Sequence, residues 1–146
     1  MDGEELTILL IEDSDADAML IERAFRKAEI RNPILHLNSG LAALKFLQAA
    51  SRTASARPIF ILLDLSLPDL SGYEVLHWVR HHPLFSTLPV VIVTGSLHPQ
   101  EAEATKASGA NAFFPKTLSF QDLSDLVNSV GAHWRLKTVS EESSRS

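Results

Sequence analysis

Residues 8–13 read ILLIED and residues 59–64 read IFILLD, so two apolar runs each end on an aspartate, Asp13 and Asp64. Polar and apolar residues do not alternate in either run, which is typical of strands buried on both faces of a parallel sheet. Runs of this kind predict strands at residues 7–12, 34–37, 59–64, 88–94 and 111–114. With helical stretches between them, the sequence predicts an α/β fold: a doubly wound sheet of five parallel strands in the order 2-1-3-4-5, covered by helices in three layers.

The helices are predicted from apolar residues at helical spacing and from residues that start or stop a helix. Ser14 is a predicted N-cap, with Asp17 three residues on as a variant of the capping box. Pro115 cannot donate a backbone hydrogen bond, so the fifth strand is expected at the edge of the sheet. The helices are expected at residues 15–29, at 41–50, between Gly72 and Pro83, at 101–108 and from about residue 119.

Length and composition limit what the chain can be. Its 146 residues suffice for a full core, and we expect one domain over residues 1–131 and a partly disordered C-terminal extension over residues 132–146. The absence of cysteine excludes disulfides, thiolate metal sites and cysteine nucleophiles. The formal net charge of −5 disfavours binding to nucleic acid or to an anionic membrane. The acidic N-terminus resembles neither a signal peptide nor a membrane span, which favours the cytoplasm.

Polar side chains of complementary chemistry follow the predicted strands. Glu12 and Asp13 close the first strand, and Asp64 closes the third; Thr94 ends the fourth and Lys116 follows the fifth. Because a parallel α/β sheet brings the carboxyl ends of its strands to one edge, we expect these side chains in one crevice. Three carboxylates there require a cation or a proton, and oxygen ligands favour a hard ion, with Mg²⁺ the natural candidate.

An aspartate beside a metal, a lysine and a hydroxyl can act as a nucleophile toward phosphorus and form an aspartyl phosphate. Asp64 is the candidate nucleophile, and Lys116 and Thr94 are candidates to bind phosphoryl oxygens. Asp64 and Lys116 on their own would suit a structural ion pair. The acids, the hydroxyl and the lysine together, each at the end of a different strand, favour phosphoryl chemistry.

Four segments resemble the signature blocks of the receiver domain of two-component response regulators, namely ILLIEDSDAD, ILLDLSLPDLSGYEVL, PVVIVTGS and FFPK. The resemblance covers nearly the whole chain and implies the receiver fold. It also implies that Asp64 accepts a phosphoryl group from a histidine kinase, and that Thr94 and Lys116 bind this group. Thr94 and Phe113 would form a switch, in which the aromatic ring moves inward when the threonine is drawn to the phosphate.

The same resemblance implies that Mg²⁺ is the cofactor. Its ligands would be Asp13, Asp64, the backbone carbonyl of Ser66, and Glu12, the last often through a water molecule. Such a ligand set leaves positions for water and for phosphate oxygens, as Mg²⁺ requires.

Within this family the chain is similar to the single-domain regulators that partner phytochrome-type histidine kinases. The grounds are the segment LLDLSLPDLSGYEVL, the loop before the third strand and Trp134 beyond the last helix. A bacteriophytochrome is therefore the expected kinase. One departure from the family is that Thr117 follows Lys116, where receivers usually have a proline in a cis bond, so the cis or trans state of the Lys116–Thr117 bond is left open.

The favoured function is that of a stand-alone response regulator, which is phosphorylated on Asp64 and signals by protein contact rather than by turning over external substrates. Haloacid-dehalogenase-type phosphatases also use a strand-end aspartate with Mg²⁺, but they place an acid two residues later, where this chain has Ser66. A flavodoxin-like flavin carrier is disfavoured because EDSDAD would repel phosphate. A pseudo-receiver that works without phosphorylation is a further alternative, which the intact acids, threonine and lysine disfavour.

The signal is expected to leave through the surface of the fourth helix, the fifth strand and the last helix. Edge strands and exposed apolar residues favour pairing, and Trp134, Leu136 and Val139 lie beyond the predicted core. We therefore expect a homodimer through this surface, with contacts from the C-terminal tail. The alternative is that Trp134 packs back on the last helix.

Overall fold

The sheet has the topology that the apolar runs predict. The computed structural model describes residues 7–53, 57–95 and 99–116. Its five parallel strands are ordered β2-β1-β3-β4-β5, which confirms the predicted order. Their bounds are β1 Ile8–Ile11, β2 Ile34–Leu37, β3 Phe60–Leu63, β4 Val90–Thr94 and β5 Ala112–Pro115. β2 matches its prediction, and the other strands differ from theirs by one or two residues at their ends.

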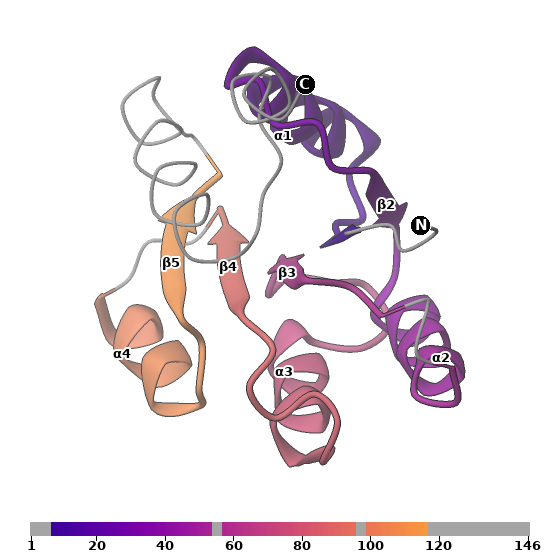
Figure 1. Cartoon of the computed structure of the whole chain (residues 1–146). Helices are drawn as coiled ribbons and strands as arrows, with labels where there is room; N and C mark the ends of the chain where they lie inside the picture. The colour runs from indigo at the N-terminus through magenta and orange to yellow at the C-terminus, as the bar shows by residue number, and fades with distance from the viewer. Residues whose placement is uncertain (1–6, 54–56, 96–98, 117–146) are drawn as a thin grey trace.

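Helices cover both faces of the sheet, with α1 on one face and α2, α3 and α4 on the other (Figure 1). Their bounds are α1 Asp15–Lys27, α2 Gly40–Ala50, α3 Gly72–His81 and α4 Pro99–Ala107. β5 is an edge strand, so Pro115 lies where it was predicted. The predicted last helix, the C-terminal tail and the Lys116–Thr117 bond lie outside the described residues, and the boundary expected at residue 131 stays a prediction.

Alternate residues of the central strands pack on opposite faces of the sheet. In β1, Ile8 and Leu10 pack in the cluster that contains the buried side of α1, whereas Leu9 and Ile11 pack in the cluster that contains α2 and α3. Every residue of β1, β3 and β4 is buried. The unbroken apolar runs are thus explained by helices on both faces. Within the described ranges, no helix is long and apolar enough to cross a membrane.

Three helices begin at a serine that caps them. The side chains of Ser14, Ser39 and Ser71 each accept a hydrogen bond from the backbone N–H three residues on, which satisfies one donor of the first turn. In α3 the cap is a complete capping box, because the Glu74 side chain also accepts from the Ser71 backbone N–H at 3.1 Å.

Asp69 joins the loop after β3 to the start of α2. The two carboxylate oxygens of Asp69 accept hydrogen bonds from the backbone N–H groups of Gly40 and Leu41, at 3.1 and 3.0 Å. A carboxylate at this end of a helix is also favoured by the helix dipole. The loop that follows Asp64 is therefore held against α2.

Arg80 joins α3 to the edge of the sheet. Its guanidinium donates hydrogen bonds to the backbone oxygens of Leu88 and Gly109, at 2.7 and 2.8 Å, and to Oδ1 of Asn111 at 2.9 Å. The same Asn111 oxygen accepts from the backbone N–H of Val90 at 2.8 Å. One side chain on α3 thus fixes the residues at the starts of both β4 and β5.

Gly72 permits a close approach between the start of α3 and the end of β3. Its backbone N–H donates to the Leu65 carbonyl at 3.0 Å. A Cβ atom at Gly72 would lie 2.4 Å from the carbonyl oxygen of Asp64 and 2.7 Å from Cα of Leu65. Both neighbours are backbone atoms, so a larger residue would displace Asp64 itself.

Replacing Gly72 by alanine is expected to destabilise the protein by about 1 to 3 kcal/mol, the usual cost of overpacking a rigid site. Gly95→Ala is the matched control, because Cδ of Lys116, the nearest described atom to its added Cβ, lies 4.0 Å away. We expect the control to change the free energy of unfolding by less than about 1 kcal/mol. Urea unfolding measures both values, and a Gly72→Ala variant as stable as the parent would contradict the close approach.

Candidate functional site

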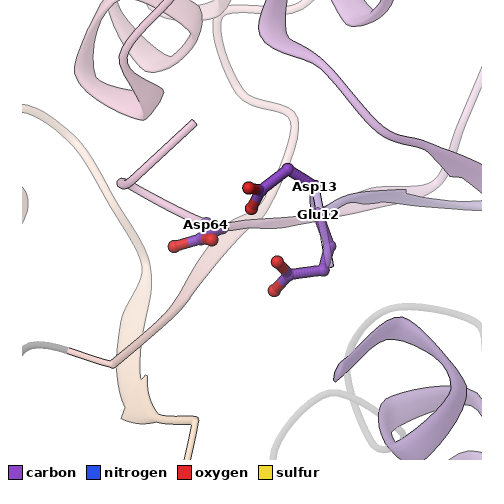
Figure 2. A group of neighbouring side chains, drawn as sticks. All are labelled: Glu12, Asp13 and Asp64. Atoms are coloured by element: carbon purple, nitrogen blue, oxygen red, sulfur yellow. The ribbon is translucent and has the colours of Figure 1, made fainter. Parts of the chain in front are cut away.

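Three carboxyl groups gather at the carboxyl ends of β1 and β3. Glu12 and Asp13 follow β1 and Asp64 follows β3, and these strands are adjacent, with Ile11 paired to Leu63. One carboxylate oxygen from each acid lies within 4.8 Å of the other two. Figure 2 shows the three carboxyl groups side by side. The structure thus brings these acids together, as the strand order predicts.

The acids fit a divalent cation in their chemistry and in their unsatisfied oxygens. Glu12 and Asp64 are 1% and 2% exposed, whereas Asp13 is exposed. Glu12 Oε2 accepts a hydrogen bond from the Ser14 backbone at 3.1 Å, and Asp64 Oδ1 accepts one from the Ser66 backbone at 3.1 Å. The other oxygens, Oε1 of Glu12 and Oδ2 of Asp64, are buried and have no hydrogen-bond partner among the described residues. Such atoms are costly unless a cation satisfies them, and a set of oxygen ligands suits Mg²⁺.

Lys116 places its ammonium group against the acids. Its position after β5 is held by the backbone N–H, which donates to the Thr94 carbonyl at 2.7 Å. The Nζ atom lies 2.9 Å from Oδ2 of Asp64, 3.0 Å from Oε2 of Glu12 and 3.0 Å from Oδ2 of Asp17. The contact with Glu12 is a hydrogen bond, whereas that with Asp64 is an ion pair without hydrogen-bond geometry.

Burial and pairing shift two pKa values at the site. Burial raises the pKa of Glu12 to about 7, although hydrogen bonds from Ser14 and Lys116 act in the opposite direction; the nearby charge of Asp64 raises it further. Burial would lower the pKa of Lys116, but its contacts with Asp64, Glu12 and Asp17 outweigh burial and raise that pKa. The lysine is therefore charged, while Glu12 resists ionisation unless a further cation joins the site.

Asp17 belongs to this site, which the sequence interpretation missed. Its backbone N–H does donate to Ser14 Oγ at 3.2 Å, as the predicted N-cap requires. The second half of the predicted capping box is wrong, because the Ser14 N–H donates to Glu12 and the Asp17 carboxylate contacts Lys116. An ammonium attracts a carboxylate more strongly than a neutral amide does. The position of Asp17, about one helical turn beyond Asp13, was the available signal.

The remaining predicted residues lie around the same edge. Thr94 is fully buried at the end of β4, where it pairs with Pro115 of β5. Phe113 of β5 is half-buried and packs against the core cluster that contains α2 and α3. Ser66 is exposed beside Asp64. Their roles in binding phosphate, switching and ligating a metal through a carbonyl stay predictions at this point.

A family model described as the response regulator receiver domain matches residues 8–128. The chain belongs to this family. The match includes every residue placed in the site above, so these acids and the lysine belong to the receiver domain. Receiver domains are signalling modules of two-component systems rather than members of a known enzyme family, and the matched family is neither a haloacid-dehalogenase-type phosphatase nor a flavin carrier.

This receiver domain is similar over most of its length to regulatory proteins of Synechocystis and of Methanothrix harundinacea. Response regulator Rcp1 of Synechocystis is 36% identical over 133 residues, which are 90% of each chain. A probable methanogenesis regulatory protein of Methanothrix harundinacea, FilR2, is 35% identical over 127 residues, 87% of this chain and 82% of that protein.

Two solved structures are informative about the site. The Mn²⁺-bound form of Rcp1 has a TM-score of 0.73 and 35% identity, covering 88% of this chain and 93% of that one. The phosphorylated cyanobacterial phytochrome response regulator RcpA has a TM-score of 0.75 and 27% identity, covering 92% and 99%. A divalent cation bound to a relative agrees with the acidic cluster of this receiver domain.

Removal of Asp13 is expected to stabilise the metal-free protein, because it relieves repulsion among three crowded acids. In chelator, Asp13→Ala should melt about 2 to 4 °C above the parent, the shift that about 1 kcal/mol produces in a domain near this size. Asp64→Asn should gain less, because Asp64 is paired with Lys116. With Mg²⁺ the gain should shrink, because the variant lacks a carboxylate for the ion.

Thermal melts with chelator and with Mg²⁺ check this expectation. Asp15→Asn is the control, since Asp15 is an exposed acid in the first turn of α1 outside the cluster. A lower melting temperature for Asp13→Ala in chelator would mean that Asp13 is structurally paired.

Proposed function

We propose that this receiver domain accepts a phosphoryl group on Asp64 from a histidine kinase and passes the signal on by protein contact. The observation that carries the proposal is the position of Asp64, whose buried Oδ2 lies 2.9 Å from the Lys116 ammonium within a group of three acids. A carboxylate oxygen of Asp64 can attack phosphorus, and the ammonium beside it can neutralise the charge that arrives with the phosphate.

The transfer forms one bond and breaks another. An oxygen of Asp64 attacks the phosphorus atom of a phosphohistidine on the kinase, so that a P–O bond forms and the P–N bond breaks. The imidazole nitrogen leaves with the electron pair of the broken bond and takes up a proton. Lys116 and Thr94 bind oxygens of the transferred group through their ammonium and hydroxyl groups, which favours the transition state by positioning and by charge.

Mg²⁺ is the proposed cofactor, held by Asp13, Asp64 and the Ser66 carbonyl, with Glu12 through a water molecule. When bound, the ion neutralises the acids and polarises a phosphoryl oxygen. The buried Oε1 of Glu12, which has no hydrogen-bond partner among the described residues, supports this assignment, since a water molecule on the ion would supply one.

A phytochrome-type kinase in the cytoplasm is the proposed donor. The support is the similarity to Rcp1 and to RcpA, the latter named as a phytochrome response regulator. The comparable similarity to FilR2, which is named as a methanogenesis regulator, makes the choice of donor a matter for direct measurement.

Thr94 and Phe113 are the proposed switch, and the surface of α4, β5 and the predicted last helix is the proposed output. Thr94 is buried on β4 next to β5, and Phe113 lies on β5, so a shift of the hydroxyl toward the phosphate would open space for the ring. β5 is an edge strand, which supports a homodimer through this surface. The tail residues after Gly131 would add contacts.

Phosphorylation is expected on Asp64 alone and only with Mg²⁺, because the acids repel an anionic donor until a cation offsets them. The parent chain and Asp64→Asn are incubated with acetyl phosphate and, separately, with an autophosphorylated bacteriophytochrome kinase. Mass spectrometry then locates any base-labile phosphate. Asp15→Asn is the matched control for loss of an acid and should label like the parent.

Equal labelling of Asp64→Asn and the parent would remove Asp64 as the acceptor, and labelling in chelator would remove the metal. A parent that no donor labels would indicate a pseudo-receiver. Labelling by acetyl phosphate but not by the bacteriophytochrome would leave the acceptor in place and refute that kinase as the donor.

Self-association is expected to respond to phosphorylation through Thr94. Light scattering should show that phosphorylation strengthens dimer formation in the parent, and that Thr94→Ala is still labelled but associates equally with and without phosphate. Truncation after Gly131 should weaken the dimer. A parent that stays monomeric at high micromolar concentration in both states would refute the dimer, and an unaffected truncation would remove the role of the tail.

A further inference from the structure

Lys116 contacts three carboxylates that come from three different elements. Glu12 follows β1, Asp64 follows β3, and Asp17 lies in the first turn of α1. An ammonium has three N–H donors and no acceptor, so three acidic neighbours match its full donor capacity. Among the described residues, Asp17 is the contacting acid that does not belong to the group that could hold a metal ion.

We propose that Asp17 is a positioning residue for Lys116, which keeps the ammonium aimed at Asp64 while the other two acids bind the cation. The proposal rests on the function proposed above and deepens it, because it names the residue that orients the phosphate-binding lysine. Nothing in the roles given to Glu12, Asp13 and Asp64 requires an acid on α1.

The contacts of the resting site cannot all persist during phosphorylation. Glu12 and Asp64 each offer a buried oxygen to a cation, and Asp64 is also the acceptor of the phosphoryl group. Asp17 has neither duty, and its side chain is 37% exposed whereas those of the other two acids are 1% exposed. Its contact with Lys116 is therefore the one that cation binding leaves intact. A lysine held on one side can direct its remaining donors to a phosphoryl oxygen.

Both ends of this ion pair are fixed by backbone hydrogen bonds. The Asp17 N–H donates to Ser14 Oγ at 3.2 Å, and the Lys116 N–H donates to the Thr94 carbonyl at 2.7 Å. The pair joins α1 to the end of β5, although β1 and β5 are separated by β3 and β4 in the sheet. Because each backbone is held by a hydrogen bond of its own, the contact restricts where the lysine side chain can lie.

A double-mutant cycle on the full chain tests the proposal. Asp17→Asn is expected to slow the labelling of Asp64 by acetyl phosphate with Mg²⁺ by about two- to five-fold, the range of a partly exposed ion pair. Lys116→Met should slow it further, and adding Asp17→Asn to Lys116→Met should have no effect. Asp15→Asn, an exposed acid in the same first turn, is the matched control and should label like the parent.

A second measurement is independent of phosphorylation. In protein labelled with ¹⁵N-lysine and saturated with Mg²⁺, the ammonium signal of Lys116 is assigned by its loss in Lys116→Met. Hydrogen exchange of this ammonium should be faster in Asp17→Asn than in the parent, by about two- to five-fold as well, and unchanged in Asp15→Asn.

The outcomes are distinct. An equal slowing by Asp17→Asn with and without Lys116 would overturn the proposal, as would an unchanged ammonium signal in Asp17→Asn. If Lys116→Met labels too slowly to compare, the ammonium signal decides. A parent that does not label would refute the proposed function, while the signal of Lys116 would still decide whether Asp17 orients it.

Discussion

One ammonium group contacts three carboxylates at the carboxyl edge of the sheet, and the organisation of this receiver domain depends on those contacts. The acids of β1 and β3 lie together because parallel neighbouring strands end at the same level. Burial makes the charge of Glu12 costly and so raises the pKa of its carboxyl group. Lys116, which follows the edge strand β5, lowers the free-energy cost of this charge through its ammonium group. Its three contacts bring α1, β1, β3 and β5 together at one site. The carboxylates of the site therefore repel one another, yet the strand order places them side by side.

The surrounding scaffold holds Asp64, the proposed phosphoryl acceptor, in place. Gly72 lets α3 start directly against the backbone of Asp64, and Asp69 ties the intervening loop to the first turn of α2. Behind them, the central strands are covered on both faces, so the strand ends have a rigid base. A nucleophile held in this way loses little entropy on reaction, which agrees with a site whose contribution is positioning and charge rather than proton transfer.

Periodicity and topology account for what the sequence could predict. Unbroken apolar runs gave the strand order, and strand order alone was enough to bring Asp13, Asp64 and Lys116 to one edge. Strand ends were less predictable, because the bounds that the hydrogen-bond pattern sets differ by one or two residues from those of the apolar runs. Asp17 was assigned to the helix cap because local spacing suits a capping box, whereas the contact that decided its position joins residues almost a hundred apart in the chain. Patterns in a single sequence do not show that a long-range ion pair can replace a local capping contact.

The hydrogen bonds of Arg80 restrict how β5 can move, because they hold the residues before it. The residues that lead into the strand are fastened to α3 through Gly109 and Asn111, and along its length the strand has β4 as its sheet neighbour. Its start is thereby anchored, while its other end carries the lysine of the charged site. A displacement that begins at the lysine would therefore bend the strand about its anchored start. The movement would be largest near the carboxyl end of β5 and would decrease toward Asn111. In a receiver built this way, a movement that starts at the lysine would bend the edge strand rather than slide it along β4.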